Sequence, residues 1–130
     1  MQDEPRPDEM LTAIAAFLKG PAVRESGPHI SFQLRVTANA TEIVQRCITL
    51  GPPAEAEELA RLRALLLIDG DLPALNRELA TRIRDGRMTL ATPGLKEHLW
   101  ATTMAKLAVD QPNYSGYRAA LAERAAAKEA

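Results

Sequence analysis

The sequence predicts an all-α fold, a single-domain bundle of four main helices followed by a short C-terminal helix. Apolar residues recur every three or four positions in several segments, which places them on one face of a helix. Gly and Pro separate these segments, and no stretch alternates apolar and polar residues as a half-buried strand does. The length of 130 residues suits one domain, so we assign residues 1–130 to it.

Composition narrows the classes of function. Aromatic residues make up 4% of the chain and hydrophobic residues 46%, so the expected core is aliphatic. A net charge of −1 provides no electrostatic attraction to nucleic acid or to an anionic membrane. There is no signal-peptide pattern and no run near the roughly 20 apolar residues of a membrane span. We therefore expect a cytoplasmic protein that binds neither nucleic acid nor membrane.

Two helices are expected in the first part of the chain. Residues 1–7 are a polar N-terminal tail, and Pro7 suits the first position of a helix that Gly20 and Pro21 end. A second helix should run from about residue 30 to 50 and end at the sequence Gly-Pro-Pro of residues 51–53. Its predicted core face carries Phe32, Val36, Ile43, Cys47 and Leu50.

Two further helices should follow, separated by a turn at residues 69–71. The third starts near Pro53 with an acidic first turn, and its core leucines are Leu59, Leu62, Leu65 and Leu66. The fourth has Asp71 as its N-cap and ends at Gly86. Its apolar stripe consists of Leu72, Leu75, Leu79 and Ile83.

The stretch from residue 100 to 118 departs most from ordinary helix-bundle composition. A helix with Thr92 as its N-cap should run from about Pro93 to residue 109 or 110, because Pro112 cannot continue it. Its apolar face should carry Leu95, Leu99, Thr103 and Leu107. A turn with two tyrosines follows, and the Ala-rich residues 119–130 should form a helix that frays.

A polar corner after this helix is our candidate binding site. Asp110 sits at a helix C-terminus, where the dipole disfavours a negative charge, so we expect a partner: Lys106, an N–H group of the following turn or a tyrosine hydroxyl. Asn39 interrupts the apolar face of the second helix, and Arg35 lies one turn earlier. Either Asn39 makes a structural hydrogen bond, or Arg35 and Asn39 both contact this corner. Alternatively, Asp110 simply caps the turn and the tyrosines pack on the bundle. The candidate binding residues are Arg35, Asn39, Lys106, Asp110, Gln111, Tyr114, Tyr117 and Arg118.

Motifs for catalysis are missing from the sequence. It has no Gly-rich phosphate loop, no nucleophile elbow and no cluster of Cys or His residues. Asp69 and Asp71 resemble part of a calcium loop, but the other ligand positions are absent. His29 and His98 are isolated, and Cys47 falls on an apolar face. We therefore expect no catalytic residues, no metal and no cofactor, and a stand-alone enzyme is the least favoured function.

Three segments resemble a known family across much of the chain. FQLRVTANATEIVQR, DLPALNRELATRIRDG and LWATTMAKLAVDQPNYSGYR are similar to DUF6285, a family of small bacterial proteins that form a domain of unknown function. The opening QDEP and MLTAIAAFLKG is similar too, so the resemblance runs from about Gln2 to Arg118.

The resemblance implies a functional context rather than a catalytic motif. Such proteins look like companions of aminoglycoside-phosphotransferase-like kinases and acyl-CoA dehydrogenase-like enzymes, often encoded alongside them. Similar sets handle hydroxyacyl-CoA intermediates, with the kinase phosphorylating the hydroxyl so that it leaves as phosphate. In such a set this chain would be an accessory subunit of the kinase. The alternative is a module that binds an acyl-CoA or its product, and we also consider a homodimer.

Overall fold

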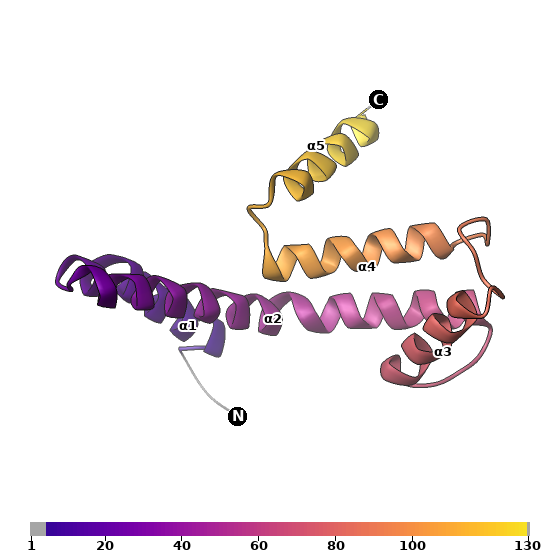
Figure 1. The fold of residues 1–130 in the computed structure, drawn as a ribbon, viewed down its shortest axis with the longest axis horizontal. Coiled ribbons are helices and arrows are strands. Elements are labelled where there is room, and N and C mark those ends of the chain that lie inside the picture. Colours follow the sequence, from indigo (N-terminus) through magenta and orange to yellow (C-terminus); the bar gives the residue numbers. More distant parts are fainter. Residues whose placement is uncertain (1–4, 130) are drawn as a thin grey trace. The chain divides into compact units, whose positions relative to one another are not determined.

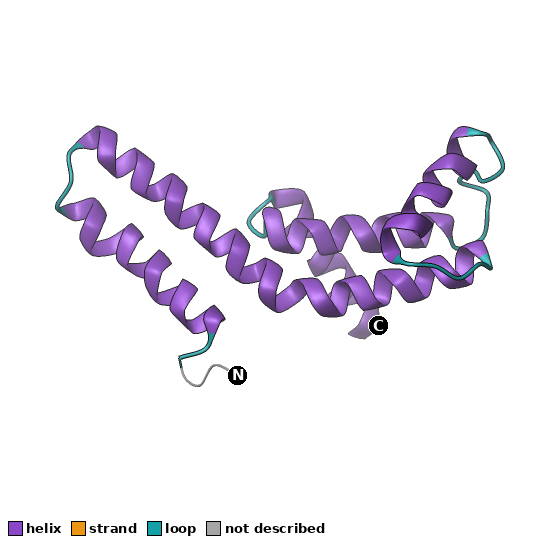
Figure 2. Ribbon diagram, turned by 90° about the horizontal axis from the view of Figure 1, so that it is seen from below, coloured by secondary structure: helices purple, strands orange, loops and turns teal. Residues whose placement is uncertain are grey.

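The structure, a computed structural model, describes residues 5–129 and confirms the all-α class. Residues 1–4 of the predicted tail and residue 130 lie outside the described residues. Four main helices and a C-terminal helix are present, and residues 5–129 contain no strand (Figure 1; Figure 2). In chain order the elements are α1 (Pro7–Phe17), the π-helix η1 (Leu18–Ala22), α2 (Pro28–Leu66), α3 (Leu72–Arg84), α4 (Leu95–Asp110) and α5 (Ser115–Glu129).

Helix α2 continues through the Gly-Pro-Pro sequence at which we predicted a break, so that prediction is wrong. The two segments predicted on either side of this sequence are one helix, so the five long segments described above form four main helices. Pro52 and Pro53 lie inside the helix and provide no N–H group for the carbonyls of Ile48 and Thr49. Residues 54–66 are rich in Ala, Glu, Leu and Arg, which are among the strongest helix formers. Their helix propensity favours a continuous helix despite the two missing backbone hydrogen bonds. The internal contacts of the chain nevertheless divide here, into a first unit of residues 1–51 and a second unit of residues 52–130.

Small residues are buried in the first unit, which contains α1, η1 and the first part of α2. Its buried residues are Ala15, Ser31 and Ala38, and the Ser31 hydroxyl lies 3.2 Å from the carbonyl oxygens of both Val23 and Ser26. The predicted helix stop at Gly20–Pro21 is wrong, because the chain continues through both residues as the π-helix.

Many large apolar side chains in this unit are exposed. Of the core face predicted for the second helix, Phe32, Val36, Cys47 and Leu50 are exposed and Ile43 is half-buried, so this prediction is wrong. Asn39 is exposed as well and can bond to water. The period of the apolar residues indicates a helix, but here the small side chains are the buried ones.

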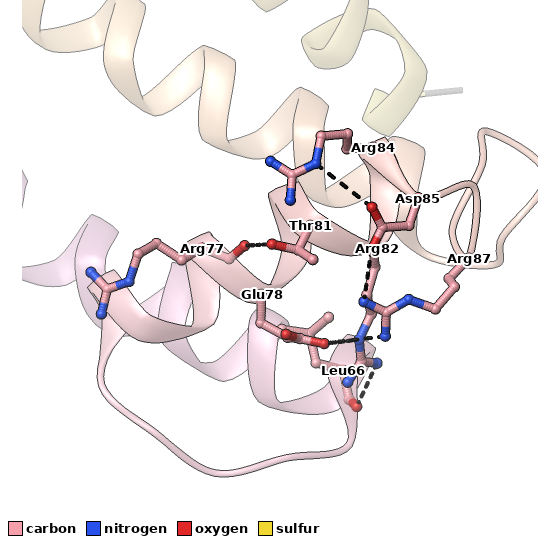
Figure 3. Close-up of polar contacts among 8 residues, drawn as sticks. All are labelled: Leu66, Arg77, Glu78, Thr81, Arg82, Arg84, Asp85 and Arg87. Carbon is pink, nitrogen blue, oxygen red and sulfur yellow. Dashed lines mark hydrogen bonds and ion pairs between the residues drawn. The ribbon is translucent and has the colours of Figure 1, made fainter.

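The second unit has a leucine core, as the sequence predicts. Its buried cluster joins α2, α3, the following loop and the start of α4. The Asp71 carboxylate caps α3 by accepting a hydrogen bond from the Ala74 N–H at 2.8 Å, which confirms the predicted N-cap. At the other end of α3, Arg82 contacts both Glu78 and the carbonyl of Leu66 (Figure 3). The cluster consists of Leu62, Leu66, Leu75, Leu79, Met88 and Leu95.

Helix α4 begins two residues later than predicted. Gly94, with φ of 83°, is its N-cap, a conformation that glycine adopts without strain. The hydroxyl of Thr92, the predicted cap, instead accepts a hydrogen bond from the Thr89 N–H at 3.0 Å and closes the loop before the helix. None of the described helices is long and apolar enough to cross a membrane.

Candidate functional site

An apolar groove lies beside α4 in the second unit. It has a volume of about 420 Å³ and is lined by Leu90, Lys96, Glu97, Leu99, Trp100 and Thr103. The residue surfaces of Leu90 and Trp100 are 74% and 60% exposed, far more than a packed leucine or tryptophan shows. A large aromatic ring that borders an apolar depression is a typical anchor for a binding partner.

The rotation of α4 about its axis creates this groove. Leu95 and His98, three positions apart, are buried, whereas Leu99, Trp100 and Thr103 are exposed. Of the apolar face predicted for this helix, Leu95 is buried and Leu107 half-buried, but Leu99 and Thr103 face outward, so that part of the prediction is wrong. The sequence contains part of the signal that we missed, because residues two positions apart, such as His98 and Trp100, point to opposite sides of a helix. It does not show which of the two sides is buried.

A second cavity of the same unit, of about 310 Å³, contains polar groups. Arg61 of α2 and His98 of α4 both line it, and His98 is only 3% exposed. Burial lowers the pKa of the His98 imidazole, and the nearby Arg61 guanidinium lowers it further, while Glu58 acts in the opposite direction. Within residues 5–129, three buried atoms have no hydrogen-bond partner: Arg61 Nε, His98 Nδ1 and Thr102 Oγ1. Thr102 lies one turn after His98.

The residues of the predicted corner fall in both units. Arg35 and Asn39 are exposed on α2 in the first unit, and Lys106 and Asp110 are exposed at the end of α4 in the second. Among residues 5–129 no ion pair or hydrogen bond joins Lys106 to Asp110. The binding role of this corner stays a prediction.

Backbone hydrogen bonds shape the tyrosine turn between α4 and α5. The Gln111 N–H donates to the Leu107 carbonyl at 2.9 Å, and the Tyr114 N–H donates to the Gln111 carbonyl at 3.0 Å. The Arg118 N–H then donates to the Tyr114 carbonyl at 3.1 Å, in the first turn of α5. Tyr114 and Arg118 are exposed and Tyr117 is half-buried, so the side chains of the turn lie at the surface.

The described part of the chain holds no group of three or more His, Cys, Asp or Glu side chains placed to bind a metal ion. The Asp69 and Asp71 carboxylates have other roles there. Asp69 pairs with Arg63, with 2.8 Å between Oδ1 and Nε, and Asp71 caps α3.

A family model matches much of the chain. The family model described as "Domain of unknown function (DUF6285)" matches residues 24–114. This span contains α2, α3 and α4 with both cavities of the second unit, and it ends before Tyr117 and Arg118. No curated protein and no solved structure matches the chain.

Proposed function

Because this chain belongs to the DUF6285 family, we propose that it is a non-catalytic accessory subunit of a phosphotransferase-like kinase in hydroxyacyl-CoA catabolism. The kinase follows from the context that the family resemblance implies. The observation that carries the subunit role is the 60% exposure of Trp100 at the apolar groove. An exposed tryptophan side chain does not provide the stabilisation that burial of its apolar surface would give. A partner that covers the ring on binding gains this stabilisation.

The composition of the groove suits a protein partner. Leu90, Leu99 and Trp100 supply apolar anchors, and Lys96 and Glu97 supply charges of opposite sign at the edge. Interfaces between proteins usually combine such an apolar centre with a polar rim. We propose that the kinase inserts apolar side chains into this groove, and that both proteins work in the cytoplasm.

Co-purification and turnover test this proposal. The full chain is expressed at native level with the kinase encoded beside it, and kinase turnover is measured with and without the chain. We expect co-purification and a turnover that depends on this chain. Trp100→Ala and Leu90→Ala should weaken the complex by about tenfold or more while leaving the chain folded, because both residues are exposed.

The control is another exposed leucine of the same unit. Leu67 is 86% exposed and lies outside the groove, so Leu67→Ala should leave the complex intact. Equal binding by Trp100→Ala, Leu67→Ala and the unmodified chain would exclude the groove as the interface. Failure of the unmodified chain both to bind the kinase and to alter its turnover would overturn the accessory role.

Self-association through the first unit is a second proposal. Phe32, Val36, Val44 and Ile48 follow a spacing of four residues, or a multiple of it, along α2, and all are about half exposed or more. A stripe of this kind on one helix can pair with the same stripe of a second copy. Sedimentation velocity of the unmodified chain should show a dimer that Val44→Lys converts to monomer; a monomer at every concentration would exclude it.

A further inference from the structure

We propose that the cavity between the second part of α2 and the start of α4 binds a small monocarboxylate with a short apolar body. Its carboxylate would lie against Arg61 and His98. This site shares Glu97 with the Trp100 groove but is otherwise lined by different residues, and its ligand does not depend on the kinase.

Two helix faces in the second unit form the walls. Arg61, Ala64 and Leu65 lie on one face of α2, at spacings of three and four residues. Gly94, Glu97 and His98 have the same spacings at the start of α4. The volume of about 310 Å³ is at the lower end of the range for small-molecule sites, roughly 300–1,000 Å³. Ala64, Leu65 and Pro93 make most of the wall apolar, which suits a hydrocarbon body.

Two unpartnered nitrogens of residues that line the cavity indicate the head group, and because neighbouring atoms cover both, the Arg61 and His98 side chains have to turn slightly for a ligand to reach them. Arg61 Nε carries a hydrogen and can only donate, so a partner must supply an acceptor. His98 Nδ1 is a second buried atom without a partner, and as the N–H tautomer it donates as well. Leaving a buried donor unbonded is costly, and a carboxylate has two oxygens that accept such bonds. An acceptor with a negative charge also suits the Arg61 guanidinium, whose own ion pair with the exposed carboxylate of Glu57 is long, at 3.7 Å.

The start of α4 adds a weaker attraction for an anion. Gly94 provides no side-chain cap for the first N–H groups of the helix, and the helix dipole favours negative charge at this end. Two acids limit the total charge that the site accepts. Glu97 lines the cavity, and Glu58 lies near His98, where its Oε1 accepts a hydrogen bond from Asn76 at 2.8 Å. This balance favours an anion with one charge, such as a carboxylate, over a phosphate dianion.

Titration of the full chain with hexanoate or benzoate tests the site, with inorganic phosphate as the comparison. The chain has two histidines, so NMR signals of the imidazole rings report on His98 once His29→Gln has identified the other. We expect a saturable shift of the His98 signals with hexanoate and a much smaller one with phosphate. Arg61→Gln should weaken hexanoate binding by about tenfold or more, because the bond from Arg61 is charge-assisted.

The matched control is Arg77→Gln, which removes an equal charge from the exposed face of α3 and should leave binding unchanged. If Arg61→Gln does not fold, Ala64→Leu replaces it, because Ala64 is exposed and lines the cavity, so the larger side chain should occupy the space of the apolar body and weaken hexanoate binding. No saturable shift of His98 up to about 10 mM hexanoate would overturn the proposal and leave water as the partner of these atoms. Equal binding of hexanoate and phosphate, or unchanged hexanoate affinity in the folded variant, would overturn it too.

Discussion

The Arg82 guanidinium of α3 donates a hydrogen bond from Nη1 to the carbonyl oxygen of Leu66, the last residue of α2, at 3.1 Å (Figure 3). Carbonyls in the last turn of a helix have no partner within the helix, so this bond caps α2 from a neighbouring element. Arg82 Nε also donates to Glu78 Oε1 at 2.7 Å. That hydrogen bond lowers the pKa of the Glu78 carboxyl, although partial burial acts in the opposite direction. One side chain therefore holds the end of α2 against α3.

Arg82→Met should lower the free energy of unfolding by about 1–2 kcal/mol, since the methionine keeps the apolar stem but leaves the Leu66 carbonyl without its donor. Urea denaturation followed by circular dichroism measures this change. Arg84→Met is the control, because the Arg84 side chain is 75% exposed and pairs with its neighbour Asp85, at 3.6 Å. An equal loss in both variants would mean that the cap contributes nothing.

Stability should depend on pH through His98. Its pKa in the folded chain is lowered, first by burial and then by Arg61. The unfolded chain therefore takes up a proton near the ordinary histidine pKa of about 6.5 while the folded chain does not, so acid favours unfolding. The free energy of unfolding should rise from about pH 5 to pH 8.

Denaturation midpoints across this pH range measure the effect. His98→Gln should flatten the rise, whereas His29→Gln, at an exposed position of α2, should keep it. A rise of equal size in both variants would assign the pH dependence to other groups.

Particular residues show what the sequence can and cannot predict. Asp71 as a cap and the core leucines Leu75 and Leu79 were predictable, because a capping residue and a local apolar period both act within one helix. The exposure of Phe32 was not predictable. The spacing of apolar residues shows which of them share a helix face, but not whether another element covers that face. The cavity at His98 depends on Arg61, 37 positions earlier, and no local pattern reports a contact across that distance.

Gly116 and Tyr114 are coupled in the turn before α5. A Cβ atom at Gly116 would lie 2.8 Å from Tyr114 Cε1 and 3.0 Å from Cζ, so the ring would have to move. Alanine normally favours a helix over glycine by about 1 kcal/mol. We expect Gly116→Ala to gain little stability in the unmodified chain, because moving the ring offsets this preference.

A double-mutant cycle isolates the ring contact. In the Tyr114→Ala background the ring is gone, and Gly116→Ala should then raise the free energy of unfolding by about 0.5–1 kcal/mol. Thermal melts of the four proteins give the coupling energy. Equal gains in both backgrounds would mean that the ring does not restrict position 116.

Pro53 lies inside a continuous helix, where its ring and its missing N–H disfavour the helix. Pro53→Ala restores a donor for the Thr49 carbonyl four residues earlier. The Thr49 hydroxyl does not compete for this bond, because it donates to the Gln45 carbonyl at 3.1 Å. We expect a gain of about 1–3 kcal/mol in the free energy of unfolding, reduced somewhat because proline also restricts the unfolded chain.

Pro28→Ala is the matched control, since Pro28 is the first residue of the same helix, a position that proline suits. It should change the free energy of unfolding little. Denaturation followed at 222 nm compares the two variants. If Pro53→Ala gains no more than Pro28→Ala, the missing hydrogen bond at residue 53 does not destabilise the helix.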